Sequence, residues 1–434
     1  MTTDALPLAE AASPDRRAGG FANLSLIAFA MFMATAVAGA MAPMLEAAKR
    51  SMELSDVQLG LVAGLAAALP TGILAVPMGR LIDRTSRVRI LFVLALIWSA
   101  GALMTAFAQT FELLFVARML AAFGMFSSVP VGISLAADLC APEQRGRSVM
   151  LLSLGNKIGA AAAFMIAAPL LGVFAQSGQS LLGLEPWRAV QFVFGAASLV
   201  LALPLLFLHE PARLELGAPS ASTVTALKAI WDRRSFLFPL FLGQVGVVMA
   251  DYAAMVWASP VLVRTFHMKE ADAGLPIGLA ILVSGIVGSI IGGFAADMGQ
   301  KAKFKGGILV GAVIMALFAI PAALFPVMPD VTTAMLALGL LLLTGAAAGL
   351  VTATTIAVKV PNEVRGVCLG AFIVAGALVG LGLAPSLVSY GSLLLGGEQH
   401  LATSLAVVGV AINIISAIAF IVAMLNIPAK VTEA

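Results

Sequence analysis

The sequence predicts an all-α membrane protein of twelve transmembrane helices arranged as two related six-helix halves. Of its 434 residues, 61% are hydrophobic and 11% are charged, whereas a soluble domain carries roughly 25% charged residues. Apolar runs recur along the chain, and a bilayer span needs about 20 such residues. Two loop motifs also occur twice in the same order. The first two observations indicate lipid as the solvent, and the third indicates duplication.

The apolar runs fall into two sets of six. The first set is expected at 21–45, 57–81, 90–108, 113–137, 149–175 and 190–208. The second set is expected at 236–263, 273–295, 307–327, 333–358, 367–394 and 401–425. The polar stretch between them contains a segment, 223–234, with the pattern of an amphipathic helix on the membrane surface. The predicted organisation is a disordered tail at 1–20, halves at 21–208 and 235–426, a linker at 209–234 and a tail at 427–434.

The distribution of basic residues predicts the orientation. Eighteen of the 25 lysines and arginines fall in segments on the side of the two termini, five fall on the other side, and two fall within spans. Loops rich in lysine and arginine stay in the cytoplasm. Both termini are therefore expected in the cytoplasm, with the chain in the inner membrane. The net charge of +3 comes from these loops and does not indicate nucleic acid.

Several other kinds of chemistry find no support. Cys140 and Cys368 lack metal-ligand spacing, and the twenty methionines form no paired set that would suit copper. The nucleotide-binding pattern GxxxxGK[ST] does not occur. No set of histidine with an acid, or of serine with histidine, falls within the spans. We expect neither a cofactor nor an enzyme.

Two loop motifs support the duplication. Gly79-x-x-x-Asp83 after the second span recurs as Gly293-x-x-x-Asp297 after the eighth. Pro142-Glu-Gln-Arg145-Gly146 after the fourth recurs as Pro361-Asn-Glu-Val-Arg365-Gly366 after the tenth. Inverted or parallel repeats of this kind are typical of transporters whose halves rock about a central site.

The first of these loops suggests a latch. Glycine at its start allows two helices to approach closely, and an acid one turn later can sit at a helix N-terminus. Its arginines can pair with an acid at the end of span four; the alternative is a solvated basic loop that only sets topology. We expect the cytoplasmic gate to comprise Gly79, Asp83, Arg84, Arg87, Asp138, Arg145, Gly293 and Asp297.

The sequence resembles the major facilitator superfamily over nearly the whole chain, and these loops carry the resemblance. The loop signature of that superfamily, Gly-x-x-x-Asp-Arg followed by basic residues, is similar to 79–89, and Pro-Glu-x-Arg-Gly-Arg is matched at 142–147. The resemblance implies the major facilitator fold. Within the superfamily the chain looks most like bacterial Spinster-type members, on Ala117-Arg118, Trp187-Arg188, Glu210-Pro-Ala-Arg213 and 380–385.

The sequence departs from the Spinster pattern at two acids. The pattern implies an Asp-Arg pair in span one, but the region of Ala34 and Thr35 is uncharged. It also implies a glutamate after the arginine of span four, where 124–126 is Gly-Met-Phe. These acids are the ones linked to proton coupling, so the coupling ion and the substrate stay open.

Three charged residues fall well inside spans, namely Arg118, Lys157 and Asp251. A charge at that depth costs about 2.5–3.5 kcal/mol on insertion scales and commonly marks a functional site. In the functional interpretation, Arg118 and Lys157 attract an anionic group while Asp251 binds a cation or exchanges a proton. In the alternative, each forms a structural ion pair or reaches an interface. The flanking Asn156, Gln244 and Tyr252 could add hydrogen bonds to a substrate or join helices.

The sequence therefore predicts a secondary active transporter working by alternating access on a small organic solute. Two basic groups against one acid favour an organic anion or an amphiphile. Protons are the candidate coupling ion, with Asp251 as carrier, because poor solvation favours the neutral form of a carboxylate. The alternatives are a uniporter without ion coupling and a non-transporting membrane receptor or enzyme. The partners expected are substrate and lipid, and the chain is expected to be a monomer.

Overall fold

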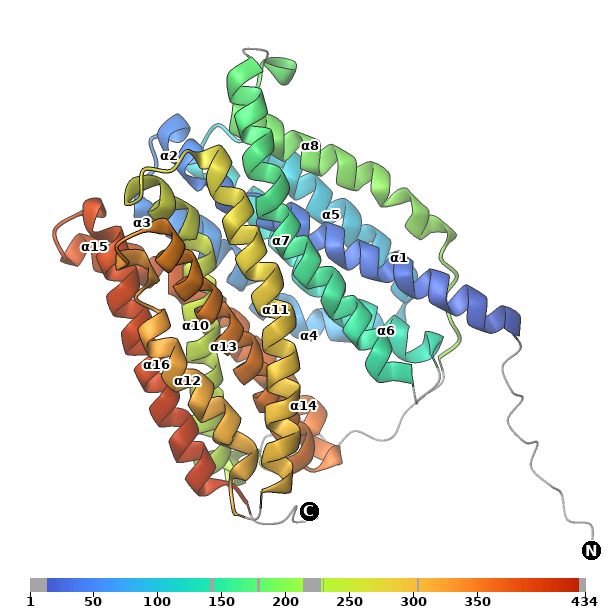
Figure 1. Cartoon of the computed structure of the whole chain (residues 1–434). Helices are drawn as coiled ribbons and strands as arrows, with labels where there is room; N and C mark the ends of the chain where they lie inside the picture. The colour runs from blue at the N-terminus through green and yellow to red at the C-terminus, as the bar shows by residue number, and fades with distance from the viewer. Residues whose placement is uncertain are drawn as a thin grey trace, which may run out of the picture.

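The computed structural model describes residues 14–140, 144–177, 180–213, 228, 230–302 and 304–428. Within these residues the regular elements are all helical, as expected, and Figure 1 shows them as two bundles side by side. Twelve helices are long and apolar enough to cross a membrane. No β-strand occurs in the described ranges. Helices satisfy their own backbone hydrogen bonds, as a chain in lipid must.

The N-terminal bundle is built from helices that turn back on one another at the membrane surfaces. Its α-helices are α1 (Pro14–Gly39), α2 (Leu45–Met52), α3 (Asp56–Gly60), α4 (Ala66–Arg84), α5 (Arg87–Phe107), α6 (Phe111–Leu139), α7 (Arg145–Ser177) and α8 (Pro186–Leu201). Short 3-10 turns η1 (Ala42–Met44), η4 (Leu181–Gly183) and η5 (Leu203–Phe207) join or extend them.

The C-terminal bundle follows the same plan. Its α-helices are α10 (Arg234–Arg264), α11 (Glu270–Lys301), α12 (Val310–Ala322), α13 (Val331–Lys359), α14 (Asn362–Ala375), α15 (Gly382–Leu394) and α16 (Leu401–Asn426). Its 3-10 turns are η6 (Gly307–Leu309), η7 (Phe325–Val327) and η9 (Glu398–His400).

Two predicted spans contain a stretch of π-helix. The second span consists of α3, the π-helix η2 (Leu61–Leu65) and α4, and the eleventh consists of α14, the π-helix η8 (Gly376–Leu381) and α15. A π-turn inserts an extra residue, shifts the faces of a helix and often occurs at functional sites. The two stretches lie in spans of different halves that contact each other.

Glycine allows the halves to touch along two seams. In one seam, a Cβ on Gly64 of η2 would lie 2.7 Å from the carbonyl oxygen of Gly382 at the start of α15. In the other, Gly274 of α11 lies against the backbone carbonyl of Phe164 of α7, where a Cβ would clash. Small residues at such crossings let membrane helices approach closely.

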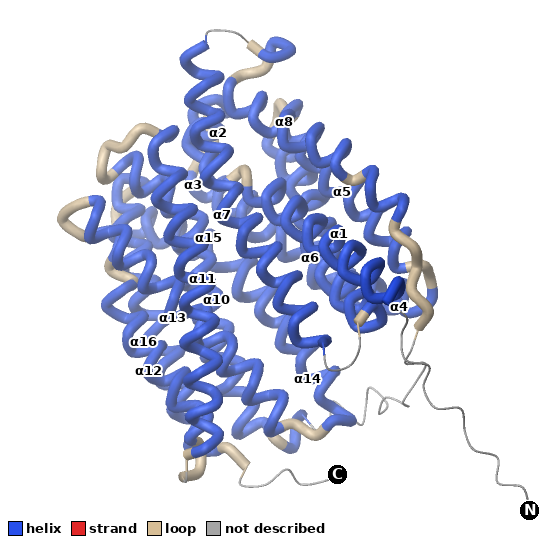
Figure 2. Tube along the Cα trace, turned by 45° about the vertical axis from the view of Figure 1, so that its right-hand side comes forward, coloured by secondary structure: helices blue, strands red, loops and turns tan. Residues whose placement is uncertain are grey.

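The two faces of the molecule can be told apart by the helix ends. We call the face at which α1 begins and α16 ends the terminal face, and the other the opposite face (Figures 1 and 2). Helix α1 begins at Pro14, so the expected tail at 1–20 is wrong in its last residues. Residues 223–227 and 229 of the expected surface helix lie outside the described residues, while Lys228 and 230–232 are helical.

Candidate functional site

On the opposite face an ion-pair network joins the two halves. Its centre is Asp56 at the start of α3, and this residue is 0% exposed. Arg264 at the end of α10 donates to both carboxylate oxygens, at 2.6 and 2.8 Å, and its Nε donates to Glu46 at 2.7 Å. Lys49 of α2 also donates to Asp56, at 2.6 Å. Bidentate arginine–carboxylate pairing is among the stronger hydrogen-bonding geometries.

Further contacts extend this network. Glu398 of the C-terminal half forms an ion pair with Lys49 and accepts a hydrogen bond of 2.7 Å from the backbone N–H of Asp56. Arg50 of α2 pairs with Glu270 at the start of α11. The N-terminal half is therefore tied to α10, α11 and η9 at the opposite face. We call Glu46, Lys49, Arg50, Asp56, Arg264, Glu270 and Glu398 the outer gate.

Arg118 of α6 lies in the interior of the protein with an incomplete set of partners. It is 9% exposed, and its Nη2 donates to the carbonyl oxygen of Ala38 of α1 at 2.5 Å. Its Nε and Nη1 are buried, and among the described residues neither has a hydrogen-bond partner. Leaving a buried charged donor unsatisfied is costly, so these two nitrogens are suited to receive an anionic ligand.

Tyr252 of α10 links the halves near this arginine. Its hydroxyl donates to the carbonyl oxygen of Ala63 in η2, at 2.7 Å. Its ring and Arg118 are near enough to interact electrostatically. Tyr252 thus joins a C-terminal helix to the π-helical part of the second span. This contact agrees with the expectation from the sequence that Tyr252 could join helices.

Lys157 and Asn156 of α7 lie where this helix meets its neighbours. A Cβ on Gly285 of α11 would lie 3.1 Å from Cδ of Lys157, so the lysine stem lies against the other half. Lys157 is exposed in the absence of lipid. Asn156 accepts a hydrogen bond of 2.8 Å from Thr35 of α1. The two residues are adjacent in sequence, but Lys157 contacts the C-terminal half, whereas Asn156 contacts a helix of its own N-terminal half.

Asp251 of α10 is directed toward α13 of its own half. Its Oδ2 lies so close to Gly345 that a Cβ at that position would overlap it. The carboxylate borders a small space that Thr344 and Asn413 also line. Asp251 and Lys157 attract one another electrostatically, but within the described residues Asp251 forms no ion pair within 4.0 Å. Asp251 lies beside Gly345 of its own half, whereas the stem of Lys157 lies against Gly285 of the other half. That both side chains face the space between the halves stays a prediction.

Gln244 lies two turns before Asp251 and also contacts α13. Its side chain is buried, and its Nε2 lies 3.4 Å from the position of a Cβ on Gly349. Its Oε1 is buried without a hydrogen-bond partner among the described residues. Gln244 and Asp251 therefore both pack against glycines of α13.

The terminal face carries a cluster within the N-terminal half. Arg87 at the start of α5 forms ion pairs with Asp138 of α6 and, at 2.8 Å, with Glu210 after η5. It also donates to the backbone carbonyl of Ser134 at 3.1 Å. The sequence anticipated the pairing of Arg87 with Asp138, whereas Glu210 was missed as a partner.

Glu210 is held in its charged form. Burial opposes ionisation, but the backbone N–H of Val88 and the side chains of Arg87 and Ser86 donate hydrogen bonds to the carboxylate. Together they hold the pKa of Glu210 below its usual value. The cluster ties the segment after the sixth span to the start of the third span.

The rest of the expected gate is arranged differently. The side chains of Asp83 and Arg84 are exposed, and Asp83 contributes its backbone carbonyl, which accepts from Arg213. Nothing lies within 4 Å of the position of a Cβ on Gly79. In this conformation the described residues show neither the expected close helix approach at Gly79 nor an ion pair that would include Asp83 in the latch.

The remaining expected gate residues are Gly293 and Asp297, in the second copy of the motif, and Arg145, in the loop after span four. Gly293 is half-buried, with Leu350 3.8 Å from the position of its Cβ, and Asp297 is exposed. Arg145 begins α7 and is half-buried. Pro142 and Glu143 lie outside the described residues. Of the expected gate residues, Arg87 and Asp138 form an ion pair with each other.

Comparison with protein families decides the family. The model of the Major Facilitator Superfamily matches residues 24–385. The chain belongs to this superfamily. Several curated relatives are 26% identical to it. The 3-(3-hydroxy-phenyl)propionate transporter of Escherichia coli matches over 61% of this chain and 67% of its own length. The probable 4-methylmuconolactone transporter of Cupriavidus pinatubonensis matches over 76% of each.

A third relative is described as an MFS-type efflux pump of Mycolicibacterium smegmatis. It is 26% identical over 58% of this chain, and the match spans 56% of its length. Among solved structures, the bacterial homologue of the human lysosomal transporter Spinster, inward-facing and unoccupied, has a TM-score of 0.77 at 21% identity. That match covers 96% of this chain and 98% of the other. It supports the fold of this superfamily member.

The outer gate is the main feature that sequence reasoning missed. Its basic residues were counted for orientation, but its acids were not paired with them. Asp56 follows Ser55, which caps the start of α3 in a capping box. An acid is favoured in the first turn of a helix by the helix dipole alone, so this position does not signal a partner farther along the chain.

Proposed function

We propose that this superfamily member is a secondary active transporter that moves a small organic anion by alternating access. The observation that carries the proposal is Arg118, a buried guanidinium with two nitrogens that lack partners among the described residues. A carboxylate accepts charge-assisted hydrogen bonds from the donors of a guanidinium, all of which lie in one plane.

The names of relatives support an acidic substrate. One transports 3-(3-hydroxy-phenyl)propionate and another is a probable L-galactonate transporter, both of Escherichia coli. Both named compounds carry a carboxylate. Because the identities are low, we transfer only the class of substrate, an organic acid with a carboxylate for Arg118.

The conformation supports alternating access. The outer gate joins the halves at the opposite face, while the Arg87 cluster at the terminal face lies within one half. Among the described residues, the ion pairs that join the halves all lie at the opposite face, as expected of a state that exchanges substrate with the terminal side. We propose that the terminal face is cytoplasmic, since it carries most of the basic residues, and that the chain is an inner-membrane monomer.

Proton coupling forms the second part of the proposal. Asp251 is a membrane-embedded carboxylate that attracts Lys157 of the other half. Rocking of the halves changes that separation. When Lys157 is near, the charged carboxylate is favoured, and when it withdraws, the neutral form is favoured. Asp251 would thus take up a proton in one state and release it in the other.

Uptake into proteoliposomes tests the proposal. We expect 3-phenylpropionate to accumulate in response to an imposed pH gradient, whereas its uncharged amide does not. Accumulation of both compounds alike would contradict recognition of the carboxylate. Equilibration of the acid without accumulation would retain the substrate class and exclude coupling to protons, leaving a uniporter.

A further inference from the structure

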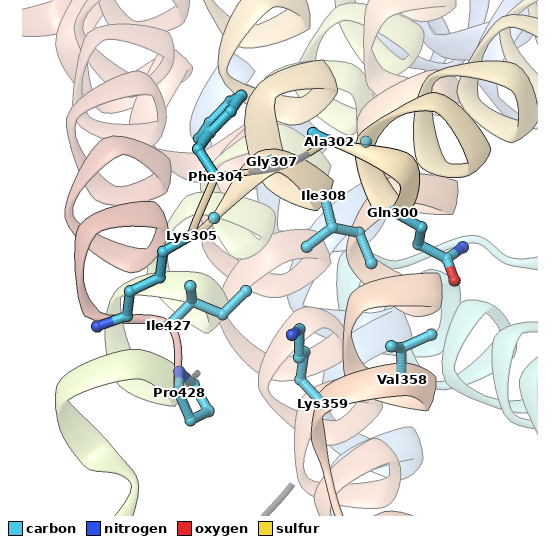
Figure 3. Close-up of a pocket in the computed structure, with 12 residues that line it drawn as sticks. Gln300, Ala302, Phe304, Lys305, Gly307, Ile308, Val358, Lys359, Ile427 and Pro428 are labelled. Carbon is cyan, nitrogen blue, oxygen red and sulfur yellow. The ribbon is translucent and has the colours of Figure 1, made fainter. Parts of the chain in front are cut away.

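A cavity of about 390 Å³ lies at the terminal face of the C-terminal half. Figure 3 shows that it is bordered by the end of α11, the turn into α12, the end of α13 and the segment after α16. The substrate path proposed above runs between the two halves. This cavity is a separate feature, because its lining residues all come from one half.

The charge of the cavity is positive. Lys359, at the end of α13, rises into the space between Ile308 and Ile427, and Lys305 lines the side nearer α16 (Figure 3). Among the described residues neither lysine forms an ion pair, and no acid lines the cavity. Two ammonium groups that share a cavity and lack a counter-charge favour an anionic occupant.

The cavity lies at the depth of lipid headgroups. Its lining residues fall at the ends of four predicted spans, which finish at Lys301, Lys359 and Asn426 and start at Gly307. Apolar side chains stand at the rim, including Phe304, which is 59% exposed. Basic recesses between transmembrane helices at such a level are typical sites for anionic headgroups.

We propose that this cavity binds an anionic phosphate group, and that the phosphate belongs to the headgroup of an anionic phospholipid. The phosphate oxygens accept hydrogen bonds from Lys305 and Lys359, while the apolar rim contacts the glycerol and the upper acyl chains. A soluble phosphate ester offers the same charge without the acyl chains. The apolar rim favours the lipid as the source.

Occupancy would hold helix ends together. A bound ligand would contact residues at the ends of α11, α13 and α16 and would neutralise the positive charges of Lys305 and Lys359. Neutralising these charges stabilises this arrangement of the C-terminal half, and a ligand that binds only the folded form raises the apparent melting temperature.

The binding test uses the full-length protein in detergent with phosphatidylglycerol, phosphatidylcholine or glycerol 3-phosphate added separately. We expect phosphatidylglycerol to bind tighter than the other two and to raise the melting temperature. The double variant Lys305→Gln/Lys359→Gln should bind it roughly thirtyfold more weakly, at about fivefold per lysine near an anionic surface. Lys301→Gln is the matched control, since Lys301 is exposed on the same face but does not line the cavity.

Each outcome bears on the proposal. Equal affinity of glycerol 3-phosphate and phosphatidylglycerol, lost in the double variant, would support the phosphate site and assign it to a soluble ligand. Unchanged binding of phosphatidylglycerol by the double variant would overturn the site, as would equal losses in the double variant and in Lys301→Gln. The test does not depend on the transported substrate, so it can fail or succeed independently of the proposed transport.

Discussion

Arg264 of α10 donates hydrogen bonds of 2.6 and 2.8 Å to the two carboxylate oxygens of Asp56 of α3, so one bidentate ion pair spans the two halves of the protein. Lys49 shares the same carboxylate. A buried acid with two cationic partners is sensitive to the removal of its own charge, because both cations then lose a counter-charge in a poorly solvated place.

Asp56→Asn should open the opposite face. Loss of one partner of a buried ion pair costs on the order of 3–5 kcal/mol, which is enough to shift the balance between conformations. Spin labels at Glu112→Cys and Thr332→Cys, in a background without Cys140 and Cys368, would report the separation of the halves. We expect a longer distance in the variant. Glu53→Gln, an exposed neighbour outside the network, is the control, and an unchanged distance in Asp56→Asn would rule out a gating role.

Arg118 should determine the affinity for carboxylates. Replacement by lysine keeps the charge but removes the planar fork, so we expect the KM for a carboxylate substrate to rise by at least about tenfold in Arg118→Lys and transport to be lost in Arg118→Gln. Binding of substrate to each purified variant separates recognition from folding. If Arg118→Gln binds the acid as the wild type does, the arginine is structural.

Particular residues show how much of the site the sequence could predict. The pairing of Arg87 with Asp138 was predictable because the predicted spans place both residues at the same face of the membrane. The direction of Asp251 was not, because α10 is buried and apolar on nearly all sides. A helix without a polar stripe does not indicate which way a given side chain points. The pairing of Asp56 with Arg264 joins residues far apart in sequence, and it depends on the conformation that the halves adopt.

The coupling role of Asp251 predicts a split phenotype. Asp251→Asn cannot exchange a proton, so gradient-driven accumulation should be abolished while counterflow exchange of substrate continues. Both can be measured in the same proteoliposomes. Full uphill transport by the variant would show that another group, or another ion, couples transport.

Glu210 predicts a dependence of stability on pH. Its pKa is lowered in the folded protein from an ordinary value of 4.5, so its charged form stabilises the fold above about pH 4.5, and this contribution is lost as the pH falls through the lowered pKa. Glu210→Gln should therefore melt at a lower temperature than the wild type at pH 7, with a difference that shrinks below pH 4.5. A difference that is independent of pH would contradict the assignment.

Gly345 provides a steric test of the recess that holds Asp251. A Cβ at this position would overlap Oδ2 of Asp251, whereas a Cβ on the neighbouring Gly349 would lie 3.4 Å from the flexible side chain of Gln244. Both glycines are on α13, and alanine should favour the helix at either position by a similar amount, about 1 kcal/mol. Gly345→Ala must displace the carboxylate, so we expect it to lose proton-driven accumulation as Asp251→Asn does, while Gly349→Ala transports nearly as the wild type. Melting temperatures measured on both variants separate this effect from misfolding. Normal accumulation by a folded Gly345→Ala would mean that the position of the carboxylate beside α13 has no part in coupling.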